Sequence, residues 1–167
     1  VKTNKKWKIL FTIPNFDTAG SGKALLNLCS RLDKKFFKPY ISCSHSKGSL
    51  FKKVISSRIP YYINNNQVEM KPRLVGVFKC YQLSKYFKKL DMDLIHSFHY
   101  GPDYSEALAA KIAGIPWIYT KKNMNWGGSS KNGWRIRSLL SSHILMQNRD
   151  MQNLFFNKSK KTSLVPR

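Results

Sequence analysis

Acidic residues are scarce in this sequence. Only 8 Asp and Glu stand against 30 Lys and Arg, which gives a formal net charge of +22 at pH 7. An excess of this size indicates an anionic partner, such as nucleic acid, an anionic membrane surface or a phosphorylated substrate. The cations are spread along the chain, so a general bias toward lysine explains the charge as well as a binding surface does. The charge alone therefore does not identify the partner.

Cysteine is also scarce, and no apolar run is long. Cys29, Cys43 and Cys80 are odd in number, far apart and without a CxxC pair, which disfavours a disulfide framework and a structural zinc site. No run approaches the roughly 20 apolar residues of a membrane-spanning helix. Pro14 and Asn15 interrupt the first apolar segment, which is therefore a poor signal peptide. We expect a cytoplasmic protein that contacts a membrane only peripherally.

The apolar content is that of a folded domain. Of the 167 residues, 42% are hydrophobic and 13% are aromatic, which suffices for one globular domain with its own core. The sequence contains no internal repeat, low-complexity linker or shift in composition. We therefore expect residues 1–167 to form a single domain.

Short apolar runs alternate with segments of helical spacing along the chain. Trp7–Asn15 predicts a strand buried on both faces, and Leu25, Leu28, Cys29 and Leu32 then recur with helical spacing. Further strands are expected near residues 39–45, 59–65, 93–100, 116–123, 143–148 and 162–166, and further helices near 49–57, 74–90, 102–115, 134–142 and 149–156. The alternation predicts an α/β fold with a doubly wound, Rossmann-like parallel sheet of about six or seven strands and helices on both faces. Such sheets bind ligands at the carboxyl ends of the strands, where the strand order reverses.

A glycine segment lies between the first strand and the first helix. It fits neither of two nucleotide-binding motifs, because Asp17 holds the first glycine position of a P-loop and Leu25 the third glycine position of a dinucleotide fingerprint. A glycine turn before a helix can still present free N–H groups and the positive end of the helix dipole to an anion. We therefore assign Gly20, Ser21 and Gly22 as a candidate phosphate loop. The alternative is that the glycines only shape a tight turn.

Two histidines lie at the end of the fourth expected strand. A regular strand places His96 and His99 on opposite faces, so they form a poor metal pair. We expect His96 to pack beneath a helix and His99, next to the loop, to reach the cleft. There a histidine can orient a sugar hydroxyl or transfer a proton near neutral pH. Glu106, further along, falls in a helix and is expected to face solvent.

The loop after the fifth strand combines cations, amides and tryptophan. Amide side chains donate and accept hydrogen bonds, and tryptophan stacks on sugar rings. A loop that only faces solvent rarely exposes Trp126 and Trp134. We therefore assign Asn123, Asn125 and Trp126 to acceptor binding, beside Lys122.

Together these segments resemble the N-terminal domain of a glycosyltransferase family 4 enzyme of GT-B architecture. The resemblance rests on "KILFTIPNF" with "AGSGKALLNLCSRL", on "DLIHSFHYGPDYSEALAAKIAGIPWIYTKKN", and on "HILMQNRDMQNLF" with "TSLVPR", and it covers nearly the whole chain. It implies a retaining, hexosyl-type transferase that uses a nucleotide-sugar donor, with no bound cofactor and no required metal. This chain is then the acceptor-binding half. The C-terminal donor-binding domain is absent from it, and the half is expected to be inactive alone.

The resemblance also implies roles for individual residues. The segment of Gly20, Ser21 and Gly22 approaches the donor phosphates. Lys122 occupies the position of a histidine that is common in the family, and with His99 it forms the expected catalytic pair. The implied acceptor is a glycan or a lipid-linked molecule of bacterial cell-envelope polysaccharide synthesis, on the inner face of an anionic membrane that attracts a basic protein.

The alternative function is a basic nucleic-acid-binding α/β module. The charge and the interleaved aromatic residues favour it. The sequence contains no RNP, helix-turn-helix or basic-helix pattern, so nucleic acid is the less favoured partner.

Overall fold

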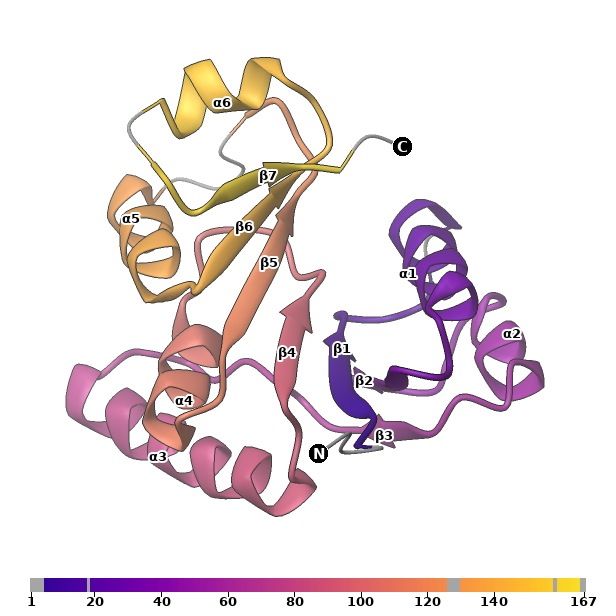
Figure 1. Cartoon of the computed structure of the whole chain (residues 1–167). Helices are drawn as coiled ribbons and strands as arrows, with labels where there is room; N and C mark the ends of the chain where they lie inside the picture. The colour runs from indigo at the N-terminus through magenta and orange to yellow at the C-terminus, as the bar shows by residue number, and fades with distance from the viewer. Residues whose placement is uncertain (1–4, 18, 126–129, 158, 166–167) are drawn as a thin grey trace.

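The computed structural model describes residues 5–17, 19–125, 130–157 and 159–165, in which strands and helices alternate throughout (Figure 1). The strands are β1 (Trp7–Thr12), β2 (Phe37–Cys43), β3 (Tyr61–Ile63), β4 (Leu94–Ser97), β5 (Trp117–Lys121), β6 (His143–Met146) and β7 (Thr162–Leu164). The helices are α1 (Ala19–Arg31), α2 (Phe51–Ser56), α3 (Arg73–Leu90), α4 (Ser105–Ala113), α5 (Lys131–Leu140) and α6 (Asp150–Phe155). The order of elements predicted from the sequence is confirmed.

The strands form one seven-stranded parallel sheet in the order β3-β2-β1-β4-β5-β6-β7. The chain adds β2 and β3 on one side of β1 and then returns to add β4 to β7 on the other side. The strand order therefore reverses between β1 and β4. This is the predicted doubly wound, Rossmann-like sheet, and its switch point locates the crevice in which such folds bind ligands.

Helices cover both faces of the sheet (Figure 1). Because successive side chains of a strand point to opposite faces, Ile9 and Phe11 pack in a cluster with Leu25 of α1, whereas Leu10 packs in a second cluster with Phe87 of α3. The continuous apolar run of β1 is thus explained by a strand that is buried on both sides.

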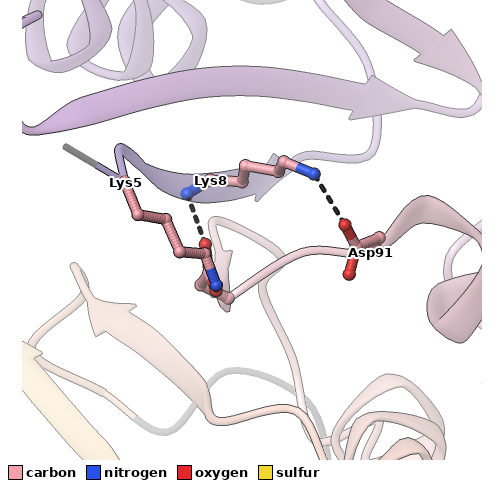
Figure 2. A network of polar contacts seen from close by, with 4 residues as sticks. Lys5, Lys8 and Asp91 are labelled. Atoms are coloured by element: carbon pink, nitrogen blue, oxygen red, sulfur yellow. Dashed lines mark hydrogen bonds and ion pairs between the residues drawn. The ribbon is translucent and has the colours of Figure 1, made fainter. Parts of the chain in front are cut away.

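Surface ion pairs join the start of β1 to the turn before β4. Lys8 donates from its Nζ to Asp91, 2.7 Å away, and from its backbone N–H to Asp93 at 2.8 Å, while Lys5 pairs with Asp93 at 2.9 Å (Figure 2). The hydrogen bond and charge of Lys8 lower the pKa of Asp91. Exposed pairs of this kind contribute little to stability, so they align the amino edge of the sheet more than they stabilise it.

The first helix begins earlier than the sequence pattern indicates. The expected phosphate loop is wrong as a loop, because Gly20, Ser21 and Gly22 form the first turn of α1. A Cβ on Gly22 would lie 2.6 Å from Leu50 and 2.9 Å from Phe16, whereas a Cβ on Gly20 would meet nothing within 4 Å. Close packing therefore requires glycine at position 22, while Gly20 faces open space.

We expect Gly20→Ala and Gly22→Ala to have opposite effects on stability. Alanine is favoured over glycine in a helix by about 1 kcal/mol, so Gly20→Ala keeps or raises the free energy of unfolding. In Gly22→Ala the new methyl group overlaps two buried side chains, and overpacking costs about 1–3 kcal/mol. Urea unfolding measures the difference. Equal free energies for the two variants would contradict the placement of Gly22.

Candidate active site

Three segments meet near the switch point: the N-terminus of α1, the loop of residues 98–104 after β4, and the loop that follows β5. Thr12 at the end of β1 pairs with Ser97 at the end of β4, so the chain leaves both strands at the same edge. Tyr100 donates from its hydroxyl to the Ser21 hydroxyl at 2.7 Å. This hydrogen bond joins the loop after β4 to the first turn of α1.

The N-terminus of α1 is suited to an anion. The first N–H groups of a helix have no partner within the helix, and the helix dipole adds a partial positive charge there. The first turn carries no acidic residue, and Gly20 is exposed with no neighbour that would hinder an approaching group. Backbone N–H groups at this end can therefore hold a phosphate or diphosphate.

His99 is buried, and its side chain is polar but unpaired. It is 3% exposed, and among the described residues neither Nδ1 nor Nε2 has a hydrogen-bond partner. Burial, with the nearby charges of Arg137 and Lys122, lowers the pKa of His99 to about 3. The ring is thus neutral at physiological pH and able to donate one hydrogen bond and accept another. It borders a small cavity of about 30 Å³, which is large enough to admit water or a hydroxyl group.

His96 belongs to the core, as the sequence predicted. It is 4% exposed, its Nε2 lies 2.8 Å from the Thr120 hydroxyl, and its ring packs against Phe11 and Phe98. Burial, and secondarily the charge of Lys122, lowers the pKa of His96 to about 3. Its place between two aromatic rings makes it a packing residue.

The two lysines at the end of β5 stabilise the loops around them. Lys121 is 2% exposed and donates to the backbone carbonyls of Asn123 and Asn125, and burial lowers the pKa of Lys121 to about 8. Lys122 donates to the Phe98 carbonyl at 3.0 Å and lies over the rings of Phe98 and Tyr100. The ammonium group of Lys122 is therefore held beside the loop that carries His99.

The structure brings four of the predicted site residues to one place. His99, Lys122, Asn123 and Asn125 line the same small cavity, and the two asparagines are exposed. Trp126, which was assigned with them, lies outside the described residues.

A buried arginine fixes the shape of the loop after β4. Arg137 of α5 is fully buried. Its guanidinium donates to the carbonyls of Asp103 at 2.9 Å and His99 at 3.1 Å. It also lies within 5.5 Å of the ring centres of Trp117, Tyr119 and Trp134. These contacts hold the backbone from the site histidine to Asp103.

Glu106 is buried, so the expectation that it faces solvent is wrong. It is 1% exposed and accepts from the Ser97 hydroxyl at 2.6 Å. Burial raises the pKa of Glu106, and the hydrogen bond from Ser97 opposes the rise. Arg137 approaches the same Ser97 hydroxyl at 3.5 Å. The buried carboxyl of Glu106 and the buried guanidinium of Arg137 therefore share one hydroxyl.

Sequence reasoning missed Arg137 and the role of Tyr100, and it misplaced Trp134. Trp134 is 6% exposed and belongs to the core rather than to a sugar platform. Its neighbour Gly133 explains how α5 comes so close, because a Cβ there would overlap the backbone of Pro102. The position of Arg137, one helical turn beyond the buried Trp134, is the sequence signal that could have placed it on the inner face of α5.

Within the described ranges, no three His, Cys, Asp or Glu side chains come together as a metal site. In the same part of the chain, no helix combines the length and the apolar character needed to cross a membrane.

Comparisons with known proteins give one family match and several structures of similar fold. A model of Glycosyltransferase Family 4 matches residues 18–153, and no curated protein sequence matches the chain. Among solved structures, HepE of Anabaena in complex with UDP and glucose is similar at 16% identity and a TM-score of 0.70, over 96% of this chain and 44% of HepE. A glycosyltransferase of Rickettsia africae is similar at 17% identity and a TM-score of 0.71, over 97% and 43% of the two chains.

MurG of Acinetobacter baumannii is a further neighbour, with 16% identity and a TM-score of 0.65 over 97% of this chain and 45% of MurG. These likenesses show the shared fold. The chain spans less than half the length of each of these three neighbours.

We expect Arg137→Ala to lower the free energy of unfolding by about 3 kcal/mol, because removing one member of a buried charged network leaves the other groups uncompensated. Arg135→Ala is the matched control, since Arg135 lies on the same helix and is exposed; it should change stability by less than about 0.5 kcal/mol. Urea unfolding measures both. Similar losses in the two variants would show that the buried guanidinium is not an anchor.

His99 should also make stability depend on pH. Because its folded-state pKa lies below the ordinary value, the unfolded chain binds more protons in acid. The contribution of the neutral His99 ring to the free energy of unfolding is therefore complete above about pH 6.5 and is lost as the pH falls toward 3. From about pH 6 to pH 5, one such histidine lowers the free energy of unfolding by about 1 kcal/mol. In urea unfolding, His99→Gln should remove that part of the decline, and His143→Gln, at the surface, is the control. An unchanged decline in His99→Gln would contradict the buried neutral ring.

Proposed function

The chain belongs to Glycosyltransferase Family 4, and we propose that it is the acceptor-binding half of an enzyme that transfers a sugar from a nucleotide-sugar donor to a glycan or lipid-linked acceptor. The donor-binding domain is a separate half. Because each half supplies only part of the site, the described half alone is expected to bind ligands weakly and to transfer nothing.

One observation carries this proposal: the unpaired imidazole of His99 and the N-terminus of α1 meet through Tyr100. Tyr100 lines the cavity beside His99 and also donates to Ser21 of α1. A group that donates and accepts hydrogen bonds and a helix end that can bind an anion are thereby joined through one residue. A glycosyl transfer needs both, one at the acceptor hydroxyl and one at the leaving diphosphate.

The donor diphosphate is assigned to the first turn of α1. Gly20 leaves the backbone open, and the Ser21 hydroxyl adds a polar contact next to the N–H groups. The structures of HepE with UDP and with UDP-glucose support a uridine nucleotide as the donor carrier. No metal is assigned to this site, because a helix N-terminus and the donor domain supply the positive charge.

The acceptor hydroxyl is assigned to the cavity beside His99. A neutral imidazole can accept the hydroxyl proton in a hydrogen bond and so direct the oxygen toward the anomeric carbon. The acceptor oxygen bonds to the anomeric carbon, the bond from that carbon to the diphosphate breaks, and the nucleoside diphosphate leaves with the electron pair and takes up the hydroxyl proton, with net retention of configuration. Lys122 adds positive charge beside the site, and Asn123 and Asn125 bind acceptor hydroxyl groups.

The reaction is assigned to bacterial cell-envelope polysaccharide synthesis at the inner face of the membrane. The net charge of +22 favours an anionic bilayer, since each Lys or Arg near such a surface contributes about 1 kcal/mol. A hexosyl donor fits this class of product.

We expect amide NMR signals of Gly20, Ser21 and His99 to shift when UDP-glucose is added to the chain. Gly20→Glu should abolish these shifts, because it places a carboxylate where the phosphates would bind. The matched control is Asn27→Glu, which adds the same charge at an exposed position further along α1 and should preserve them. Simple glycans should shift His99 and Lys122.

If neither UDP-glucose nor the glycans shift the NMR signals of these residues, the proposed transferase site is wrong. If an oligonucleotide then produced broad shifts and bound with a steep salt dependence, the alternative of a basic nucleic-acid-binding module would replace it.

A further inference from the structure

Helix α3 carries apolar side chains on two opposite sides. Its inner side packs against the core with Gly76, Cys80, Leu83, Ser84 and Phe87. Its outer side exposes a set that we name the α3 patch: Leu74 (87% exposed), Val75 (45%), Val77 (47%), Phe78 (59%) and Tyr81 (46%). An amphipathic surface helix normally presents polar residues on its outer side. The first half of α3 therefore departs from that pattern.

The α3 patch is concentrated, not scattered. Leu74, Phe78 and Tyr81 follow one another at helical spacing and so form one continuous stripe. Single exposed apolar side chains are common on proteins, but a contiguous group rimmed by polar residues marks a contact site.

Cations surround the α3 patch, and α3 contains no acidic residue. Exposed basic residues lie at both ends of the stripe: Lys71 and Arg73 before it, and Lys85, Lys88 and Lys89 after it. The ammonium group of Lys85 lies 4.6 Å from the centre of the Tyr81 ring. The outer side of α3 thus combines an apolar centre with a mainly basic rim, and the exposed Glu69 and Asp91 lie before and after the helix.

The apolar half of α3 is the half nearer to the candidate active site. The segment before α3 approaches the start of α4, where the Val68 N–H donates to the Ser105 hydroxyl at 3.0 Å. Ser105 directly follows the loop that carries His99. The other end of α3 leads to the amino end of β4. In Figure 1, α3 lies on the outside of the molecule beside α4.

We propose that α3 docks onto an anionic lipid bilayer, with the α3 patch inserted among the lipid headgroups and the surrounding cations on the anionic phosphates. An apolar face rimmed by Lys and Arg is the arrangement by which helices lie in a membrane interface. The inference rests on the proposed function, for which it names the membrane-facing surface and the side from which a lipid-linked acceptor approaches.

Charge complementarity selects the bilayer over other partners. A second copy of the chain would bring two basic rims against each other, which opposes association. A nucleic acid would use the cations and leave the apolar stripe exposed to water. An anionic lipid surface satisfies both parts of the patch at once.

Co-sedimentation with vesicles tests the proposal. The chain should bind vesicles of phosphatidylcholine with phosphatidylglycerol and should not bind phosphatidylcholine alone. Leu74→Ser combined with Phe78→Ser should lower the partition coefficient at least about tenfold, because two apolar side chains no longer leave water; that factor equals about 1.4 kcal/mol. The substitutions are on exposed side chains, so the urea unfolding curve should stay unchanged.

Matched controls distinguish vesicle binding through the α3 patch from nonspecific hydrophobic binding and from binding by net charge alone. Leu139→Ser with Leu154→Ser removes two leucines that are 75% and 62% exposed elsewhere on the surface and should keep wild-type binding. The triple variant Lys85→Gln, Lys88→Gln, Lys89→Gln should bind more weakly than a triple variant at the exposed Lys34, Lys35 and Lys38. That difference should vanish near about 1 M salt, where charges are screened beyond about 3 Å.

Three results would overturn the proposal: no binding to the anionic vesicles, equal binding by the α3 patch variant and the wild type, or self-association in sedimentation velocity that the patch variant abolishes. No nucleotide sugar is present in the vesicle assay. A failure there therefore leaves the UDP-glucose titration as an independent test of the transferase site.

Discussion

The candidate site depends on one buried cation. Arg137 donates to the backbone carbonyls of His99 and Asp103, so the loop after β4 keeps its shape only while α5 is docked behind it. Taking a guanidinium out of water is costly. Aromatic rings and the buried Glu106 offset part of this cost. The conformation of the loop that positions the site histidine is thus fixed by Arg137, which makes its hydrogen bonds inside the fold.

The two edges of the sheet are stabilised in different ways. At the amino edge, Lys5 and Lys8 meet two carboxylates, of which Asp91 is exposed and Asp93 is partly buried. At the carboxyl edge, polar groups such as His99 and Glu106 are buried, where each unmatched atom is expensive. The unpaired nitrogens of His99 therefore lie at the edge where the strands leave room for a ligand.

The sequence predicted the strands and helices because the spacing of hydrophobic residues depends only on positions close together in the chain. The run in β1 and the spacing in α1 were sufficient for element type, and the crossover rule then predicted a doubly wound parallel sheet. The failures concern which side of a helix meets a neighbour. Glu106 occupies a helical position like any solvent-facing charge, and Phe78 has the spacing of a core residue, yet the structure buries the first and exposes the second. His99 was placed correctly at the edge. Its unpaired nitrogens depend on long-range packing that no local pattern contains.

The hydroxyl pair of Tyr100 and Ser21 joins parts of the chain that are 79 residues apart. It links the end of α1 that faces an anion to the loop that carries His99. A ligand that moves either segment therefore also changes the energy of the other segment. By thermodynamic reciprocity, if the first ligand changes the affinity for the second by some factor, the second changes the affinity for the first by the same factor. One hydrogen bond thus couples the two sides of the crevice, and the coupling free energy is the same whichever side is filled first.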